Sequence, residues 1–448
     1  MKIRTLAAKA AGKISKAVLE KRGGGSSLPG KLAMRLDPDI LSELAKNYRV
    51  IMVTGTNGKT LTTSFITHIF EQKFGPVLTN PTGANMVQGI VSCFLGAKKP
   101  VGRPFAVLEI DEATLKLVTP FIKPEAIVFT NVFRDQMDRY GEIYTTYKLM
   151  CDGAALAREA VIIANGDLPM FNSEMLVNPV EYFGFDHLPE KEQTAPVNAD
   201  DVLCPACDNV LHYKLLTYAN LGSYYCPECD FKRPRLAHRV TAVSELTPES
   251  SRFSIDGVEF DLPIAGLYNI YNALAAYSVA KHFGINDNYI RRGFDASKRV
   301  FGRQEHISIG DKDVVMNLMK NPVGFNQLVD MLETDKEPFS LVSILNDRPA
   351  EGTDVRWIWD GNFEKLVAIT SGRPVFLSGI RMADYATRFK IAGLPESEAH
   401  MDQDLTHIAD WIKKAPTRKV YILATYTATL DLRRVFAEQG WIKEGASE

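Results

Sequence analysis

The sequence predicts an α/β protein: a doubly wound parallel sheet, a small insertion in that sheet domain, and a second, smaller α/β domain near the C-terminus. Two observations carry this prediction. Short apolar runs alternate with segments long enough for helices, and four cysteines stand as two closely spaced pairs. With 448 residues, 46% hydrophobic and 24% charged, the composition is that of an ordinary globular protein of about three domains. The formal net charge of -2 provides no global basic field, so nucleic acid is not expected as a partner.

The first 45 residues predict a basic helix followed by a linker. Apolar residues from Ile3 to Val18 recur at helical spacing, and lysines and arginines occupy the rest of the wheel. The segment has no continuous apolar run and no cleavage site of a secretory signal, and no stretch reaches the length of a membrane span, so we expect a cytoplasmic protein. The helix either lies on the anionic inner face of a membrane or docks on its own domain. The glycine- and serine-rich residues 23–30 predict a flexible linker.

A phosphate-binding turn is predicted directly after the first strand. The apolar run 49–53 leads into Thr-Gly-Thr-Asn-Gly-Lys-Thr at 54–60, and a helical pattern follows. Strand, glycine turn and helix N-terminus together form a cradle whose backbone N–H groups bind phosphates. Lys59 would reach the β- and γ-phosphates of ATP, and the Thr60 hydroxyl would bind Mg2+. The residues that we expect at the nucleotide here are Thr56, Asn57, Gly58, Lys59 and Thr60.

More strands predict the rest of the sheet and the second domain. Strand-like runs in the first domain occupy residues 105–110, 126–131 and 161–165. Parallel strands bind ligands at their carboxyl ends, where Glu109 and Asn131 stand. Similar runs at 341–345, 374–378 and 419–424 predict a smaller α/β domain from about residue 306. The predicted units are 1–45, 46–305 and 306–448.

The paired cysteines predict a zinc ribbon at about 200–234. Two residues separate the members of each pair, so both thiolates of a pair can point at one ion, and two pairs complete a closed tetrahedral site. The ligands are Cys204, Cys207, Cys226 and Cys229. With four thiolates no position is left for water, so the Zn2+ would be structural. The alternative is two redox-active pairs or disulfides, which a reducing cytoplasm disfavours.

The turn at 54–60 resembles the phosphate loop of the Mur ligases and folylpolyglutamate synthases, in which valine or a similar residue replaces the first glycine of the generic pattern, as Val53 does here. The resemblance continues, in the family's order, at 130–139, 165–167, 267–273, 301–305 and 320–322. It implies a Mur ligase-type ATPase domain over 46–305 and a Mur ligase-like C-terminal domain over 306–448.

By this resemblance Glu109 would share the Mg2+ with Thr60. The alternative for Glu109 is a surface carboxylate or a cap at a strand end, and the adjoining Asp111 and Glu112 compete for the metal role. Asn269 and Asn272 resemble the adenine-side asparagines and share one helix face, and their alternative role is helix capping.

Arg303 and Lys320 resemble cations that contact ribose or phosphates when the domains close, and their alternative is a solvated surface charge. Lys148 keeps the family's spacing from Tyr144 for a carbamylated lysine but lies about two residues closer to the preceding aspartates. Gln136 replaces a histidine of the family pattern. These two departures leave open whether a second metal site exists.

The inserted ribbon, residues 346–360 and the missing substrate-binding N-terminal domain are similar to the MurT family, the synthetase subunits of lipid II isoglutaminyl synthase. This implies that ATP activates the α-carboxylate of D-glutamate in the lipid II stem peptide as an acyl phosphate. Ammonia from a separate GatD-type glutamine amidotransferase subunit would then give D-isoglutamine. A carboxylate is a poor electrophile, so positioning and charge neutralisation around Lys59 and Glu109 would carry the catalysis.

The separate glutaminase partner is what the resemblance implies, and the two unpaired cysteines of this chain agree with it. Cys93 and Cys151 have no glycine-flanked elbow and fit buried small hydrophobic positions. Residues 346–360 hold two tryptophans beside charges, which is typical of an interface, although a substrate-side loop with buried tryptophans is the alternative. The resemblance implies that one of Asp347, Asp354 and Asp360 orients the partner's catalytic histidine, and we favour Asp354.

Two other functions compete. A ligase that adds an amino acid would share the phosphate loop, but the missing N-terminal domain and the cysteine ribbon do not suit it. A zinc-containing nucleotide-binding scaffold without catalysis would have less need of acidic residues around the phosphates.

Overall fold

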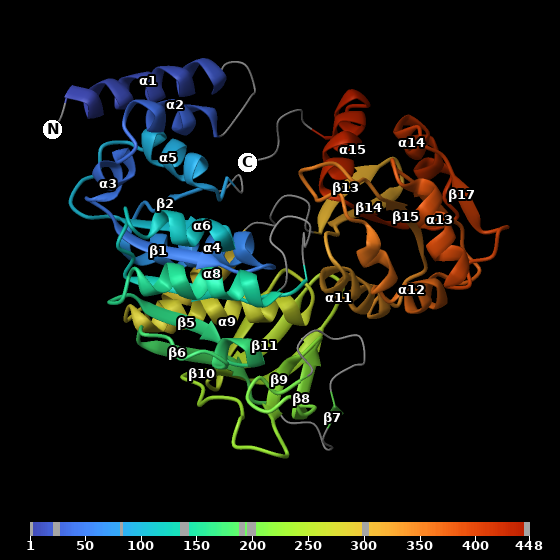
Figure 1. Cartoon of the computed structure of the whole chain (residues 1–448). Helices are drawn as coiled ribbons and strands as arrows, with labels where there is room; N and C mark the ends of the chain where they lie inside the picture. Colours follow the sequence, from blue (N-terminus) through green and yellow to red (C-terminus); the bar gives the residue numbers. More distant parts are fainter. Residues whose placement is uncertain are drawn as a thin grey trace.

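The computed structural model describes residues 3–20, 27–80, 84–134, 143–187, 193–194, 203–297 and 304–442. Figure 1 shows two α/β bodies side by side, with helices α1 and α2 above the first and the cysteine-bearing insertion below it. None of the helices in these ranges is both long and apolar enough to cross a membrane.

The N-terminal helix docks on its own domain. Helices α1 (Ile3–Glu20), α2 (Leu28–Leu36) and α3 (Ile40–Ala45) precede the first strand, and α1 packs on α2 and on α5 (Val87–Gly96). The inward face of α1 is small: Thr5, Ala8 and Gly12 are buried, and a Cβ on Gly12 would lie 2.6 Å from a methyl carbon of Leu95. Small residues therefore let the helices approach closely, and the docked alternative is the one that the structure shows.

The predicted linker is shorter than expected, because α2 already begins at Leu28. Pro29 lies in the first turn of α2, where a missing N–H breaks no helical hydrogen bond and the fixed φ suits a helix. The proline at this position therefore starts a helix, and residues 28–30 do not belong to the linker.

The central sheet is parallel over most of its width. Its strands are β1 (Arg49–Thr54), β2 (Leu78–Thr79), β3 (Phe105–Glu109), β4 (Ala126–Phe129), β5 (Val161–Asn165), β6 (Val180–Phe185), β10 (His238–Leu246), β11 (Ser251–Ile255) and β12 (Val258–Leu262). Their order is β12-β11-β10-β6-β5-β4-β1-β3-β2; β10 is still parallel to β6, and β11 and β12 extend the sheet in antiparallel pairs. The predicted parallel sheet is confirmed. The extension was not predicted, because β12 alternates buried and exposed residues and so shows no apolar run.

Helices cover the central sheet, and two of them that are far apart in the sequence, α4 (Lys59–Phe74) and α9 (Leu267–His282), pack together beside the phosphate loop. The covering helices are α4, α5, α6 (Glu112–Val118), α8 (Ile143–Ala155), α9 and α10 (Asp287–Ala296), with a short 3-10 helix at Pro169–Asn172. Helix α9 packs against α4 and is buried over most of its length. The insertion adds a small sheet of β7 (Gln193–Thr194), β8 (His212–Tyr218) and β9 (Leu221–Tyr225).

The second body is an α/β domain, as predicted, and it is built on a six-stranded sheet. Its strands are β13 (Glu305–Ile309), β14 (Lys312–Leu318), β15 (Phe339–Ile344), β16 (Val375–Ser378), β17 (Ala399–Met401) and β18 (Lys419–Ala424), in the order β13-β14-β18-β15-β16-β17. Helices α11 (Pro322–Glu333), α12 (Phe363–Thr370), α13 (Met382–Ile391), α14 (Leu405–Lys414) and α15 (Tyr426–Glu438) cover its two faces over separate apolar layers. The exact domain boundaries stay predictions.

Candidate active site

The phosphate loop joins β1 to α4 and needs both of its glycines. Gly55 and Gly58 have φ values of +129° and +83°, which favour glycine. A Cβ on Gly58 would lie 2.0 Å from the Oδ1 atom of Asn272. The glycines therefore allow the turn itself and its close approach to α9.

Asn131, at the carboxyl end of β4, fixes the loop. The Asn57 N–H donates to its Oδ1 at 2.8 Å, and its Nδ2 donates to the Asn57 carbonyl at 3.0 Å. Its carbonyl accepts from the Thr56 N–H at 2.8 Å, and the neighbouring Thr130 hydroxyl donates to the Asn57 carbonyl at 3.0 Å. The loop is thus held in shape before any ligand arrives.

Lys59 is buried and pairs with Glu112, which the sequence had offered as a competitor for the metal role. Its Nζ lies 3.3 Å from Glu112 Oε2 and donates to the carbonyls of Gly55 and Thr56. Burial raises the pKa of Glu112, while Lys59 and Lys320 act in the opposite direction. Glu112 therefore acts as the counter-charge of the phosphate-loop lysine.

Glu109, the last residue of β3, has one carboxylate oxygen without a partner. The side chain is only 4% exposed, and its Oε1 accepts from Asn85 Nδ2 at 2.9 Å. Asn80 fixes the backbone on both sides, accepting from the Glu109 N–H at 2.8 Å and donating to its carbonyl at 2.9 Å. Oε2 is buried with no hydrogen bond. A buried carboxylate oxygen left unmatched beside a phosphate loop fits a Mg2+ ligand, because Mg2+ prefers oxygen.

Asn269 and Asn272 share one face of α9, as predicted, and that face lies beneath the phosphate loop. Asn272 Nδ2 donates to Asn269 Oδ1 at 3.2 Å, and Asn269 donates to the Ala265 carbonyl at 2.6 Å. The Thr62 hydroxyl donates to Asn272 Oδ1 at 3.3 Å. Both side chains are almost fully buried. Their contact with adenine stays a prediction.

The C-terminal domain contacts the loop directly. The amides of Asn321 and Asn57 exchange hydrogen bonds of 3.0 and 3.3 Å, and Asn321 also caps α11. Lys320 lies close enough to Glu112 to oppose the rise in its pKa that burial causes. Arg134 and Asp360 form a further contact between the domains at 4.0 Å. A lysine and an asparagine from the second domain thus border the phosphate loop.

The structure does not test several predictions about single residues. Arg303 and Gln136 lie outside the described residues. Lys148 is exposed on α8, so its carbamylation stays a prediction. Thr60, the second residue of α4, is half-buried, and its role as a Mg2+ ligand also stays a prediction.

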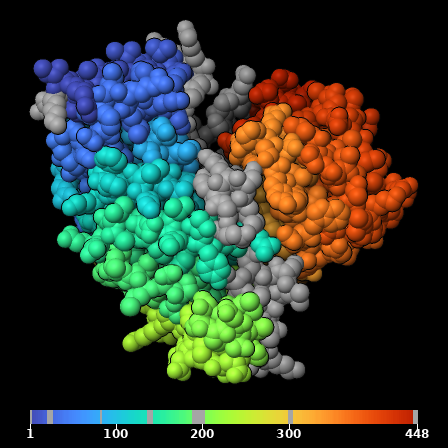
Figure 2. All heavy atoms as spheres, in the orientation of Figure 1, coloured from blue at the N-terminus to red at the C-terminus, as the bar shows by residue number. Residues whose placement is uncertain are grey.

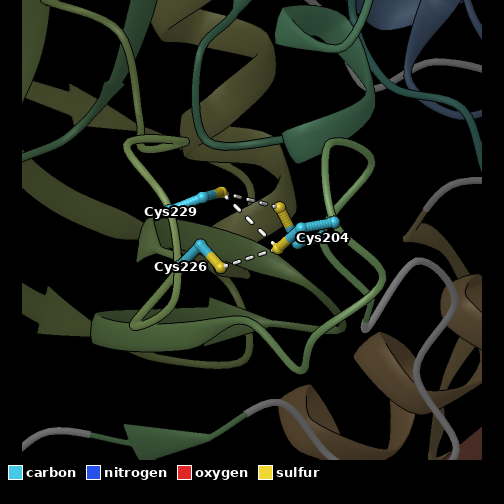
Figure 3. Close-up of side chains that lie close together, drawn as sticks. Cys204, Cys226 and Cys229 are labelled. Atoms are coloured by element: carbon cyan, nitrogen blue, oxygen red, sulfur yellow. Dashed lines mark hydrogen bonds between the residues drawn. The ribbon is translucent and has the colours of Figure 1, made fainter.

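The four cysteines converge, as Figure 3 shows. Cys204 Sγ lies 3.6 Å from Cys229 Sγ, and Cys207 Sγ lies 3.5 Å from Cys226 Sγ and 3.6 Å from Cys229 Sγ. Thiolates around one Zn2+ at about 2.3 Å would be about 3.8 Å apart. The cluster therefore fits one zinc ion.

Asp167, in the family landmark after β5, joins the insertion to the central sheet. Its buried carboxylate binds Arg233 at 3.0 Å, accepts from the Tyr271 hydroxyl at 2.6 Å and accepts from the Phe185 N–H at 2.7 Å. Tyr271 stands next to Asn272 on α9, and its hydroxyl also bonds Thr217 of the insertion at 2.9 Å. Tyr271 thus anchors the insertion on α9 directly beside Asn272, which contacts the phosphate loop.

The two remaining cysteines are not activated. Burial raises the pKa of the Cys93 thiol to about 12 and that of Cys151 to about 11. Cys93 donates to the Thr79 carbonyl. Neither thiol is set up as a nucleophile at neutral pH.

The aspartates of 346–360 differ in their surroundings. Asp347 pairs with Arg381 at 3.3 Å and Asp360 faces Arg134. Asp354 pairs with Arg356, which lowers the pKa of its carboxyl, and the Arg356 side chain is 86% exposed. Of the tryptophans, Trp359 is 52% exposed, while Trp357 is half-buried near Phe325.

Two models of known protein families match separate parts of the chain, one in each α/β body. Residues 53–202 match the model of the Mur ligase middle domain, and residues 318–429 match the model of the MurT ligase C-terminal domain. Among solved structures, a pseudomurein peptide ligase type C from Methanothermus fervidus superposes with a TM-score of 0.66 over 90% of this chain and 81% of that one, at 21% identity. The fold is therefore that of the Mur ligases.

Two relatives define the family more closely. The lipid II isoglutaminyl synthase (glutamine-hydrolyzing) subunit MurT of Streptococcus pneumoniae R6 is 45% identical over 99% of both chains. The subunit of the same name from Staphylococcus aureus COL is 34% identical over 86% of both. The chain belongs to the MurT family, and the resemblance seen in the sequence is confirmed.

Proposed function

We propose that this chain is the ATP-dependent synthetase subunit that amidates the α-carboxylate of D-glutamate in the lipid II stem peptide, giving D-isoglutamine. The observation that carries the proposal is the set of groups around the phosphate loop: a buried lysine, a carboxylate oxygen without a partner, and Lys320 and Asn321 from the second domain. The named function of the MurT relatives supplies the substrate class.

The residues suit phosphoryl transfer to a carboxylate. Backbone N–H groups of residues 56–60 and the Lys59 ammonium would neutralise the phosphates, and Lys59 would exchange its Glu112 contact for them. Glu109 and Thr60 would hold Mg2+, which shields charge on the transferring phosphoryl group. Arg303 and Lys320 would close on the nucleotide, and Asn269 and Asn272 would support its adenine side. The acyl phosphate that forms is open to attack by ammonia.

The ammonia donor in this proposal is a GatD-type glutamine amidotransferase that forms a heterodimer with the chain. Both unassigned thiols are unactivated, so glutamine hydrolysis needs another subunit. Asp354 is our candidate for the carboxylate that orients the partner's histidine, because its carboxyl is ionised and its ion-pair partner Arg356 is exposed and free to move aside.

The cysteine cluster is proposed to hold one structural Zn2+. Its thiolates leave no open position for water, so the metal would fold the insertion without taking part in the reaction. Metal analysis of the native chain should find about one equivalent of zinc, and less than about half an equivalent would contradict the site. Cys204→Ser should lower stability before it lowers activity.

We also propose that the chain is cytoplasmic and works at the inner face of the membrane, because the acceptor is lipid-linked.

One experiment separates the candidate functions. The chain is incubated with ATP, lipid II and either ammonium or a set of amino acids, and the products are weighed by mass spectrometry. Amidated lipid II with ammonium supports the proposal, and an adduct with an amino acid supports the alternative ligase. ATP binding with no product of either kind would indicate a scaffold.

A further inference from the structure

Helix α1 shows its apolar face to the outside of the molecule. At about 100° per residue, four of its five large apolar residues fall within a stripe about 120° wide, opposite the buried Thr5, Ala8 and Gly12, while Leu19 lies on the inward side. Their exposed fractions are high: Ile3 86%, Leu6 51%, Ile14 66% and Val18 46%. An ordinary surface helix has its polar face outside, so this helix is inverted relative to its domain.

Helix α2 continues the apolar surface. It packs beside α1, and Leu28, Leu32 and Leu36, four residues apart, are 50%, 38% and 43% exposed. Figures 1 and 2 show the two helices at one outer edge of the molecule, at the end opposite the insertion. Single exposed apolar residues are common, but seven on two helices that pack side by side indicate an interaction surface.

The charges around this surface are positive. Lys13 on α1 and Lys31 and Arg35 on α2 are exposed, and they have no ion pair among the described residues. Two nearby acids are already paired: Asp37 with Arg4 at 2.9 Å, and Glu43 with Lys46 at 2.7 Å and with Lys9 at 3.7 Å. An apolar centre flanked by free cations complements an anionic surface.

The residue composition of α1 and α2 favours a bilayer over a protein as the partner of this surface. Protein interfaces are enriched in aromatic residues and depleted in lysine. Neither α1 nor α2 contains an aromatic residue, and both carry exposed lysine. Leucine and isoleucine beside lysine and arginine are typical of helices that lie in the membrane interface.

We propose that the outward faces of α1 and α2 form a docking surface for a bilayer of anionic phospholipid. The apolar side chains enter the headgroup region, and Lys13, Lys31 and Arg35 contact lipid phosphates. The proposal rests on the proposed function in one respect, because a lipid-linked acceptor gives the enzyme a reason to bind the membrane.

The test is flotation of the full-length chain with vesicles of phosphatidylglycerol and phosphatidylcholine, compared with vesicles of phosphatidylcholine alone. The variant Leu6→Glu/Ile14→Glu should reduce binding to anionic vesicles at least 10-fold. The matched control Met175→Glu/Val177→Glu replaces two exposed apolar residues of a loop, 97% and 60% exposed, and should bind as the unchanged chain does. Lys13→Gln/Lys31→Gln/Arg35→Gln should weaken binding and reduce its dependence on salt. Circular dichroism and thermal melting check that each variant is folded.

Three results would overturn the proposal: no binding of the unchanged chain, undiminished binding of Leu6→Glu/Ile14→Glu, or equal binding to neutral vesicles. If the double variant instead loses a dimer in light scattering, or loses its amidotransferase partner in a pull-down, the surface binds a protein and the proposal is wrong.

Amidation is measured separately with a short-chain, water-soluble lipid II analogue. Loss of vesicle binding with full activity on the analogue supports both the docking surface and the proposed function. Lack of activity in the unchanged chain would count against the function alone.

Discussion

The carboxyl edges of the two parallel sheets look alike in sequence but differ in hydrogen bonding. At the first edge, buried Glu109 ends β3 and has an oxygen with no partner. Beyond the second edge, Glu351 is just as deeply buried, yet its Oε1 accepts from the Thr427 hydroxyl at 2.6 Å and its Oε2 accepts from the Thr427 N–H at 3.0 Å. Strand ends thus predict where polar groups gather. At these two glutamates, the unmet acceptor sets the proposed ligand site apart from the structural position.

The largest effect should come from the lysine of the first edge. Lys59→Ala removes the charge that would meet the transferring phosphoryl group, so ATP-dependent amidation should fall at least about 100-fold, and Thr60→Ala should behave likewise. Lys419 is the matched control, because it is a buried lysine of the second sheet paired with Asp335 at 2.7 Å. Lys419→Ala should lower the melting temperature and leave kcat/KM of the folded enzyme near its original value. Full activity in Lys59→Ala would rule out this site.

The two glutamates provide the direct test of the comparison. Glu109→Ala should reduce activity by about 100-fold, with partial rescue by high Mg2+, because a metal ligand is lost. Glu351→Ala should instead lower the free energy of unfolding by about 1–3 kcal/mol, since it leaves buried Thr427 groups unpaired, and the Mg2+ requirement should not change. Titration of activity with Mg2+ and chemical unfolding measure the two effects. An unchanged Mg2+ dependence in Glu109→Ala would contradict the ligand assignment.

A smaller and more selective effect is expected at Asp354. Asp354→Asn should reduce glutamine-dependent amidation about 10-fold or more, because a neutral amide supports an imidazolium poorly. ATP binding and complex formation should be unchanged, and added ammonium should restore the product. If the variant is equally inactive with ammonium, Asp354 belongs to the synthetase site.

The smallest effect concerns pH and Glu112. Burial raises the pKa of Glu112 above its ordinary value, so the folded state favours the protonated carboxyl. The stabilisation that results is complete below the pKa of the unfolded state and is lost as the pH rises through the pKa of the folded state. Glu112→Gln should flatten this part of the melting-temperature profile. Glu364 has the opposite sign: Arg388 lowers the pKa of its carboxyl, so Glu364→Gln should remove stability that is present above the unfolded pKa and lost in acid. Profiles that shift the same way in both variants would contradict the assignment.

Features that depend only on neighbouring residues in the sequence were predictable. The runs at 161–165 and 419–424 are strands β5 and β18, because each is a short apolar run buried along its whole length. The cysteine pairs were found for a similar reason, since ligand spacing is local. Asn131 was expected at the site because it follows a strand.

Features that depend on long-range contacts were not predictable. Asn80 and Asn85 hold Glu109 from a different strand and loop, and no pattern in the sequence links them to it. The pairing of Lys59 with Glu112 depends on how α6 packs against the loop. The close packing of α2 against α5, where a Cβ on Gly30 would lie 1.9 Å from the Gln88 carbonyl oxygen, also joins segments that are far apart in the sequence.

The Asp167 cluster has a consequence for the order in which the protein folds during synthesis. Asp167 leaves the ribosome before every group that bonds its carboxylate, namely Phe185, Arg233 and Tyr271. A nascent chain that ends within the insertion would bury this carboxylate without a cation, which is strongly unfavourable. We therefore expect the edge of the central sheet beside β5 to be stable only after the whole insertion and α9 have been made. The cysteine-bearing insertion would then be a step in the assembly of the domain that carries the phosphate loop.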